Sequence, residues 1–276
     1  MEDADLSYYA KLLDEVIDVF SVLVDPAAVP EVGSLATDEL RAAREQQGHG
    51  AVWGDEPILL AYETAMICYR SALESGKAMV ALMNGRFSAV PVSSLARSLA
   101  EVSGQAWWLL EPDIGCVRRV RRLQALRYRS ASEGERAAKA DGAASDEYHR
   151  YTETTTEVEQ YSRTLGLDVP RRDRFVYICG EERLATASHR VVSMFADVDV
   201  PSVYRLYSGF PHGELFALRQ AFSSSSHGDG LRHFQPIITN EAFKGAVAVA
   251  SYALYPPAAR LSCLFGFDKP HAPALD

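Results

Sequence analysis

Residues 55–85 read DEPILLAYETAMICYRSALESGKAMVALMNG, and this stretch decides the fold class. Asp55 is a residue type that caps helix N-termini, and Pro57 fits the first helical turn, where its missing amide hydrogen is not needed. Asn84 and Gly85 form a helix-ending pair, because both residues adopt left-handed backbone conformations easily. The spacing therefore predicts one long helix over about 56–84.

Helical patterns continue on both sides of this stretch. Residues 6–24 place apolar side chains at mostly three- and four-residue steps, which is the spacing of one helix face. Thr37 is the expected cap of a short helix that follows. We expect further helices over about 89–110, 114–140, 146–165, 181–196, 201–222 and 241–265, the last one kinked or split at Pro256-Pro257.

The segments between these helices predict few strands. Residues 167–179 fit a short strand or an extended loop, and the Ser/Gly-rich residues 223–230 fit a flexible loop. We therefore expect an all-α fold, a single-domain multi-helix bundle of about seven to nine helices. Within residues 1–276, an acidic N-terminal helical segment (about 1–55) would pack on a core bundle (about 56–266).

Charge is distributed unevenly along the chain. The 276 residues carry a net charge of −9, which argues against a generic nucleic-acid coat and gives no DNA signal. Residues 1–64 hold 14 acidic and 3 basic side chains, a net of −11. Residues 113–140 hold 8 Lys/Arg against 3 Asp/Glu. Two interpretations of this basic segment stay open: a solvated helix face or a phosphate-facing surface.

The cysteines and the N-terminus indicate the compartment. Four cysteines occur without CxxC spacing, so reduced, buried thiols are expected rather than disulfides or a metal site. No basic segment precedes an apolar run at the N-terminus, and no uncharged apolar run reaches about 18 residues. We expect a soluble cytoplasmic protein without a membrane partner.

Arg205 and His212 are the main candidate catalytic residues. They stand in the stretch Tyr204–Gly213, which also holds Tyr207 and Ser208. Arginine brings a permanent cation, and histidine titrates near neutrality, so the pair suits phosphate chemistry. It also suits a structural hydrogen-bonded arrangement with His212 in the core.

A second candidate group lies on the expected helix over about 89–110. Arg97 and Glu101 are four residues apart and can pair on an otherwise apolar helix. Buried charges need partners, and those partners often form a site. Gln105 and Trp108 continue the same face at four- and three-residue steps. The alternative is a structural ion pair beside a core tryptophan. The expected substrate-binding residues are Arg97, Glu101, Trp108, Tyr204, Tyr207 and Ser208.

Several common site motifs do not occur in the sequence. No ExxH or HExxH is present on an expected helix, so a di-iron or zinc site is not indicated. No glycine-rich phosphate loop and no GxSxG elbow occur either. We expect neither a metal nor a cofactor.

A family resemblance rests on four features taken together. They are Arg97-x-x-x-Glu101, the run Trp107–Pro112, the arginines at 118, 119, 121 and 122, and the stretch Tyr207–Gly213. The combination is similar to a set of actinobacterial helical proteins of unknown function, which in turn resemble the HEPN superfamily of helical bundles. The resemblance covers about residues 90–220.

The resemblance implies a mechanism and a partner. In HEPN ribonucleases an arginine and a histidine separated by four to six residues carry RNA cleavage, and Arg205 and His212 match that spacing. His212 would then act as general base or acid, while Arg205 would stabilise the charge on the phosphate. No metal would be needed. HEPN proteins act as dimers, so the resemblance implies a homodimer and RNA as a partner.

Two other functions stay open. The chain holds 13 Tyr, 11 Phe and 3 Trp, and a bundle lined by aromatic side chains can enclose a small molecule. The protein would then be a biosynthetic enzyme or a ligand-binding protein, recognised by a cavity of roughly a few hundred Å3. The second possibility is a non-catalytic dimeric scaffold. In the ribonuclease, Arg118, Arg119, Arg121 and Arg122 would form a positive rim.

Overall fold

The structure, a computed structural model, is mostly helical. It describes residues 3–24, 29–50, 52–85, 89–141, 146–173, 176–196, 222–226, 232–236 and 240–267. Within these ranges it contains eight α-helices, one short 3-10 helix, a three-stranded sheet and a two-stranded sheet. The predicted helical bundle is therefore confirmed as the main architecture. The all-α prediction was wrong about the two small sheets.

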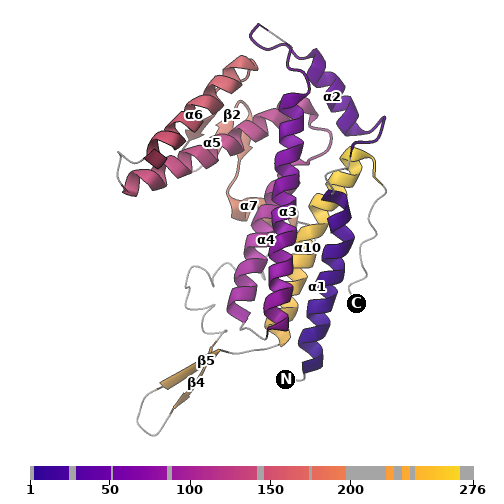
Figure 1. The fold of residues 1–276 in the computed structure, drawn as a ribbon, viewed down its shortest axis with the longest axis vertical. Coiled ribbons are helices and arrows are strands. Elements are labelled where there is room, and N and C mark those ends of the chain that lie inside the picture. The colour runs from indigo at the N-terminus through magenta and orange to yellow at the C-terminus, as the bar shows by residue number, and fades with distance from the viewer. Residues whose placement is uncertain are drawn as a thin grey trace.

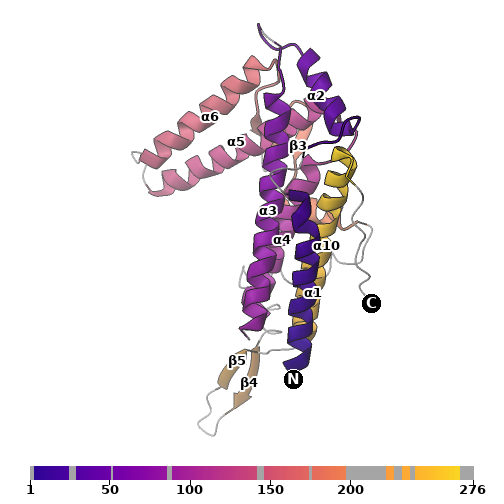
Figure 2. The ribbon, with the colours of Figure 1, turned by 45° about the vertical axis from the view of Figure 1, so that its right-hand side comes forward.

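Four long helices lie side by side along the long axis of the molecule (Figures 1 and 2). They are α1 (Asp3–Ser21), α3 (Glu56–Asn84), α4 (Ala89–Leu109) and α10 (Asn240–Phe265). Helix α3 runs opposite to the other three (Figure 1). Its bounds agree with the sequence prediction, because Pro57 and Asn84-Gly85 mark its two ends. The short 3-10 helix η1 (Val22–Val24) extends α1.

The faces that these helices bury make one hydrophobic core. Leu13, Ile17 and Phe20 of α1 are almost fully buried, at the three- and four-residue steps expected from the sequence. Tyr69 of α3 is fully buried, and its hydroxyl donates to the carbonyl oxygen of Leu254 in α10 at 2.9 Å. This hydrogen bond satisfies the only polar group of a core tyrosine.

Helix α10 continues through Pro256 and Pro257. Of the prediction that this helix is kinked or split at the two prolines, the split was wrong. Proline removes one backbone hydrogen bond and disfavours helix in isolation. Here α10 packs against both α1 and α4, and this packing holds the helix together across the prolines.

Helix α2 (Leu35–Glu45) covers one end of the bundle (Figure 1). Its cap is Ser34, whose hydroxyl oxygen accepts from the amide of Thr37 at 3.3 Å. The prediction of Thr37 as the cap was therefore three residues too late. Both residues are good caps, and only the backbone conformation decides between them.

Helices α5 (Gly115–Asp141) and α6 (Asp146–Thr164) form an antiparallel arm that projects from the bundle (Figures 1 and 2). The arm is held by a close approach of the two helices at Gly134. A Cβ atom at Gly134 would overlap the aromatic ring of Tyr151. Glycine is therefore required there by space, although its backbone conformation is ordinary.

A small antiparallel sheet packs against α5. Its strands are β1 (Arg171–Asp173), β2 (Val176–Cys179) and β3 (Glu182–Leu184), in the order β1-β2-β3. Helix α7 (Ala187–Met194) follows, capped by Thr186, and packs on α4. The prediction of a helix from 181 was wrong at its start. Glu182 and Leu184 point inward and Arg183 outward, which is the two-residue period of a strand.

A β-hairpin lies at the end of the bundle opposite to α2 (Figure 1). Strand β4 (Phe222–Ser226) pairs antiparallel with β5 (Arg232–Pro236). The predicted loop over 223–230 was therefore wrong for Ser223–Ser226. A run of serines favours neither loop nor strand strongly, and the backbone ladder with β5 decides. The predicted helix over 201–222 lies outside the described residues except for its last position.

Three of the cysteines are buried thiols, as expected, and none of the four forms a disulfide. Cys263 is exposed, so the prediction of burial was wrong for that residue. It lies on the outer face of α10, where only the helix spacing and not the residue type determines burial. Of the helices in the described residues, none is long and apolar enough to cross a membrane.

The close contact between α5 and α6 at Gly134 can be tested by substitution, with Gly104 of α4 as a control position. We predict that Gly134→Ala lowers the free energy of unfolding by about 1–2 kcal/mol, because overlap with Tyr151 outweighs the gain in helix propensity. Gly104→Ala is the matched control, since its Cβ would meet Val191 at an ordinary 3.5 Å. It should leave stability unchanged or raise it. Chemical denaturation measures both, and a stabilised Gly134→Ala would contradict the close packing.

Candidate functional site

The predicted ion pair of Arg97 and Glu101 is present on α4. Arg97 Nε donates to Glu101 Oε1 at 2.7 Å, and the two side chains are only 16% and 26% exposed. A half-buried pair of this kind is more strongly coupled than a surface pair, because solvent screens it less.

The two neighbouring tryptophans face different helices. Trp108 is buried, and the Arg122 guanidinium of α5 lies 4.8 Å from its ring centroid. The Arg260 guanidinium of α10 lies 3.8 Å from the ring of Trp107 and donates to the carbonyl oxygen of that residue at 2.6 Å. Both indoles are thus covered by protein cations. Trp108 closes the end of the Arg97–Glu101 face by packing with Arg122.

The other predicted site residues lie outside the described residues. They are Arg205, His212, Tyr204, Tyr207 and Ser208. Helix α7, the last described helix before them, packs on α4 with Val191 3.5 Å from the position of a Cβ at Gly104. Of the predicted set, the described chain therefore holds Arg97, Glu101 and Trp108, all on α4, and the contact that it shows within this set is the Arg97–Glu101 pair.

The arginine-rich start of α5 turns inward. Arg119 is fully buried, and its guanidinium donates to both carboxylate oxygens of Glu39, each at 2.7 Å. It also donates to the carbonyl oxygens of Leu109 and, at 2.9 Å, Glu111. The Tyr62 hydroxyl donates to Glu39 Oε2 at 2.6 Å. One buried cation thus joins α2, α3, α5 and the turn after α4.

Arg118 and Arg122 share a second carboxylate. Arg118 Nε and Arg122 Nε donate to the two oxygens of Glu182 in β3, at 2.6 Å and 2.7 Å. Arg122 also pairs with Glu111 at 2.6 Å. Burial raises the pKa of Glu182, but the hydrogen bonds from both arginines outweigh it and hold that pKa below its usual value. Neither sequence interpretation, solvated face or phosphate-facing surface, fits Arg119 and Arg122.

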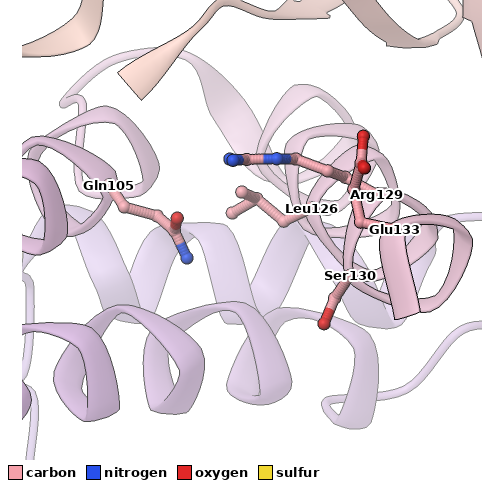
Figure 3. A pocket seen from close by; sticks show the side chains of 5 residues that line it. All are labelled: Gln105, Leu126, Arg129, Ser130 and Glu133. Atoms are coloured by element: carbon pink, nitrogen blue, oxygen red, sulfur yellow. The ribbon is translucent and has the colours of Figure 1, made fainter. Parts of the chain in front are cut away.

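A pocket lies between α4 and the middle of α5 (Figure 3). Its volume is about 310 Å3. The described residues that line it are Gln105 of α4 with Leu126, Arg129, Ser130 and Glu133 of α5. It lies next to the predicted Arg97–Glu101 face, because Gln105 is the next residue on that face.

Arg129 differs from the four arginines at the start of α5, and it resembles Arg127, which stacks on the Tyr161 ring at 5.5 Å and has no ion pair with a described residue either. Arg118, Arg119 and Arg122 each pair with a carboxylate within 2.7 Å, and Arg121 with Asp168 at 3.4 Å. Arg129 has no ion pair with any residue that the structure describes. Figure 3 shows its guanidinium extending over Leu126 towards Gln105. The pocket therefore presents unused N–H donors.

Glu133 is the expected partner of Arg129, four residues further along α5, but it is engaged elsewhere. The Tyr177 hydroxyl of β2 donates to Glu133 Oε1, and Arg136 donates to the same carboxylate at 3.3 Å. The hydrogen bond from Tyr177 holds the pKa of Glu133 below its usual value, with help from the charges of Arg136, Arg172 and Arg129. Glu133 is thus a fixed anion at one edge of the pocket.

Gln105 is fixed by a hydrogen bond behind the pocket. Its Nε2 donates to Sγ of Cys68 in α3 at 3.3 Å. Burial raises the pKa of the Cys68 thiol, so Cys68 is uncharged near neutrality. Because the amide nitrogen is engaged, the carbonyl oxygen of Gln105 remains to accept a hydrogen bond from a ligand.

A second hollow of about 280 Å3 lies between α2 and the start of α5. Its lining includes Asp38, Glu39, Asp113 and Cys116. Glu39 is committed to Arg119, and Asp38 pairs with Arg41 at 3.0 Å. Among the described residues, no cluster of three or more His, Cys, Asp or Glu could hold a metal ion. We therefore take the α4–α5 pocket as the candidate site.

Sequence reasoning found Gln105 but not the rest of the pocket. Arg129, Ser130 and Glu133 were counted only as part of a basic segment. One signal was available: Glu133 stands four residues after Arg129 and three before Arg136, so two arginines compete for one carboxylate. Because the two arginines compete for Glu133, the guanidinium of one of them is left without this carboxylate as a partner.

Comparisons with models of known protein families, with curated proteins and with solved structures found no match.

Because Glu39 is the charge partner of the buried Arg119, we predict that removing Glu39 destabilises the protein more than removing its neighbour Asp38. Glu39→Ala leaves the Arg119 cation buried without its charge partner, so it should lower the free energy of unfolding by about 3–5 kcal/mol. Asp38→Ala removes an exposed pair and should change it by less than about 1 kcal/mol. Urea denaturation measures both variants. Equal losses of unfolding free energy in the two variants would show that the buried Arg119–Glu39 pair matters no more for stability than the exposed Asp38–Arg41 pair.

Proposed function

We propose that this protein binds a small polar molecule with an anionic group in the α4–α5 pocket. The observation that carries the proposal is the Arg129 guanidinium, which points into the pocket without an ion pair among the described residues. Partly buried cations are usually paired, because desolvation of an isolated charge is costly. A bound anion would supply the missing partner.

The lining sets the chemistry of the ligand. Arg129 offers a planar fork of donors that suits carboxylate or phosphate oxygens. Gln105 offers an acceptor for a ligand N–H or O–H, and Leu126 offers an apolar wall. The volume of about 310 Å3 stands at the lower end of the usual range for small-molecule sites. This differs from the aromatic-lined cavity expected from the sequence, since no described lining residue is aromatic.

Calorimetric titration with malonate, citrate and inorganic phosphate tests the proposal. We predict saturable binding of at least one of these anions to the wild type. Arg129→Ala should weaken it by at least tenfold, about 1.4 kcal/mol, because a charge-assisted hydrogen bond is lost. Arg163→Ala is the control, since it removes the same charge from an exposed pair on α6. Absence of binding, or equal losses in both variants, would refute the proposal.

A second candidate function is metal-independent cleavage of RNA. It is favoured by the spacing of Arg205 and His212, which matches the HEPN pattern, and by the helical architecture. His212 would move the proton at the 2′-hydroxyl or at the leaving oxygen, and Arg205 would stabilise the phosphate charge. The expected homodimer would place two such pairs in one cleft.

An assay on RNA tests the second candidate. We predict that purified dimeric protein cleaves RNA in the presence of EDTA, and that His212→Ala reduces the rate by at least about 100-fold because the proton-transfer group is lost. Circular dichroism must show that the variant is folded. Intact RNA after incubation with folded, dimeric wild type would end the ribonuclease hypothesis. An unfolded His212→Ala would instead assign the residue to the core.

A further inference from the structure

We infer that Cys68 is a positioning residue of the α4–α5 pocket, and that through it the pocket selects a small carboxylate that also carries a hydroxyl or amino donor. Cys68 holds the side-chain amide of Gln105 with its oxygen towards the pocket. The inference rests on the proposed function, since it names the ligand class of that same pocket. It is carried by the hydrogen bond between Gln105 and Cys68 and by the place of Gln105 opposite Arg129 (Figure 3).

The Cys68 thiol lies on a closely packed part of α3. Cys68 is buried, and its helix neighbours Ala65, Tyr69 and Ala72 are fully buried. Helix α3 packs against α4, and the Nε2 of Gln105 on α4 donates to Cys68 Sγ at 3.3 Å. A site residue is held precisely when its partner stands on a rigid element. The orientation of the Gln105 amide is therefore set by the packing of the two helices.

Gln105 presents an acceptor, and not a donor, to the ligand. A glutamine amide has a donor end and an acceptor end of nearly equal size, so the partner of one end decides what the other end offers. The nitrogen donates to Cys68, which leaves the oxygen for the pocket. Figure 3 shows this oxygen on the side of Leu126 and Arg129, with the nitrogen turned away.

Gln105 and Arg129 thus offer opposite chemistry to one ligand. The guanidinium of Arg129 has only donors, which suit the oxygens of a carboxylate. The carbonyl oxygen of Gln105 suits an O–H or N–H. The charged acceptor in the described lining, Glu133, already accepts from the Tyr177 hydroxyl and from Arg136. A ligand that satisfies both Arg129 and Gln105 needs a carboxylate and, because the pocket is small, a donor close to it.

The hydrogen bond to Cys68 also keeps the amide from adapting to other anions. A freely rotating amide could turn its N–H group to any carboxylate bound at Arg129. With the nitrogen held by Cys68, an anion that has no donor leaves the Gln105 oxygen without a partner. A site built around a hydrogen bond rejects an analogue that cannot form it.

Three dicarboxylates separate the donor from the negative charge. Succinate has two carboxylates and no donor. Malate is succinate with one added hydroxyl group and the same charge at neutral pH, so a difference between these two reports the hydroxyl alone. Aspartate carries an ammonium group at the same position. The comparison of malate with aspartate shows which of the two donors the pocket takes.

The experiment is calorimetric titration of the full chain with these three probes. We expect malate or aspartate to bind the wild type at least about tenfold tighter than succinate, because succinate leaves the Gln105 oxygen unpaired. Cys68→Ala should reduce this preference to below about threefold, since the released amide can donate to succinate. Succinate itself should bind this variant at least as tightly as the wild type. A purely structural role of Cys68 would instead weaken all three probes alike.

Three further variants keep the test decisive. Cys68→Ser keeps an acceptor in place, because a serine inside a helix can donate its own proton to the carbonyl four residues back, so the preference should persist. Gln105→Leu removes the acceptor and should abolish the preference even if Cys68→Ala folds poorly. Cys263→Ala makes the same change at an exposed thiol and should bind like the wild type.

The outcomes separate the inference from the function on which it rests. Equal binding of the three probes to the wild type, or an unchanged preference in Gln105→Leu or in folded Cys68→Ala, overturns the inference. If succinate binds as tightly as malate and aspartate, and Arg129→Ala weakens all three, the inference fails and the proposed function stands. The same holds if only malonate or phosphate binds in an Arg129-dependent way. If no anion binds, both fail.

Discussion

The ion pair between Arg119 and Glu39 is the interaction on which the arrangement of the upper half of the molecule depends. It is fully buried, and it joins α2, α3, α5 and the end of α4 through one guanidinium group. Such a pair contributes more to a unique arrangement than to net stability, because its desolvation offsets much of its attraction. It fixes the rotation of α5 about its axis and so decides which arginines turn inward.

The remaining arginines of α5 follow from that rotation. Arg118 and Arg122 meet Glu182 of the sheet, while Arg129, further along the helix, comes to lie opposite Gln105 of α4. The same helix therefore carries cations that pair within the fold and, at Arg129, a cation at the pocket that has no ion pair with a described residue. The sheet contributes Tyr177, whose hydroxyl donates to Glu133 at the edge of this pocket. The ion pairs that stabilise the fold and the charged residues of the candidate site thus lie on the same helix and beside the same sheet.

The sequence predicted the long helices well and the site poorly. Helix α3 was predicted with its observed bounds because its signals are local: a proline at the start and Asn-Gly at the end. Strand β3 was missed since its three residues are shaped by pairing with β2, not by their own preference. The partners of Arg119 and Arg122 lie 80 and 60 residues away in the chain. Helical periodicity gives no information about contacts at that separation. Arg119 and Arg122 were therefore expected on the surface, as part of the basic segment, although they are buried.

The central claim is that Arg129 binds the anionic group of a ligand. The most direct measurement is a set of crystal structures of the protein soaked separately with malonate, citrate and inorganic phosphate. The account predicts density for at least one of these anions in the α4–α5 pocket, with oxygens about 2.7–2.9 Å from the guanidinium nitrogens of Arg129. A pocket that stays empty with all three anions, or an Arg129 side chain paired with a carboxylate of the protein, would contradict it.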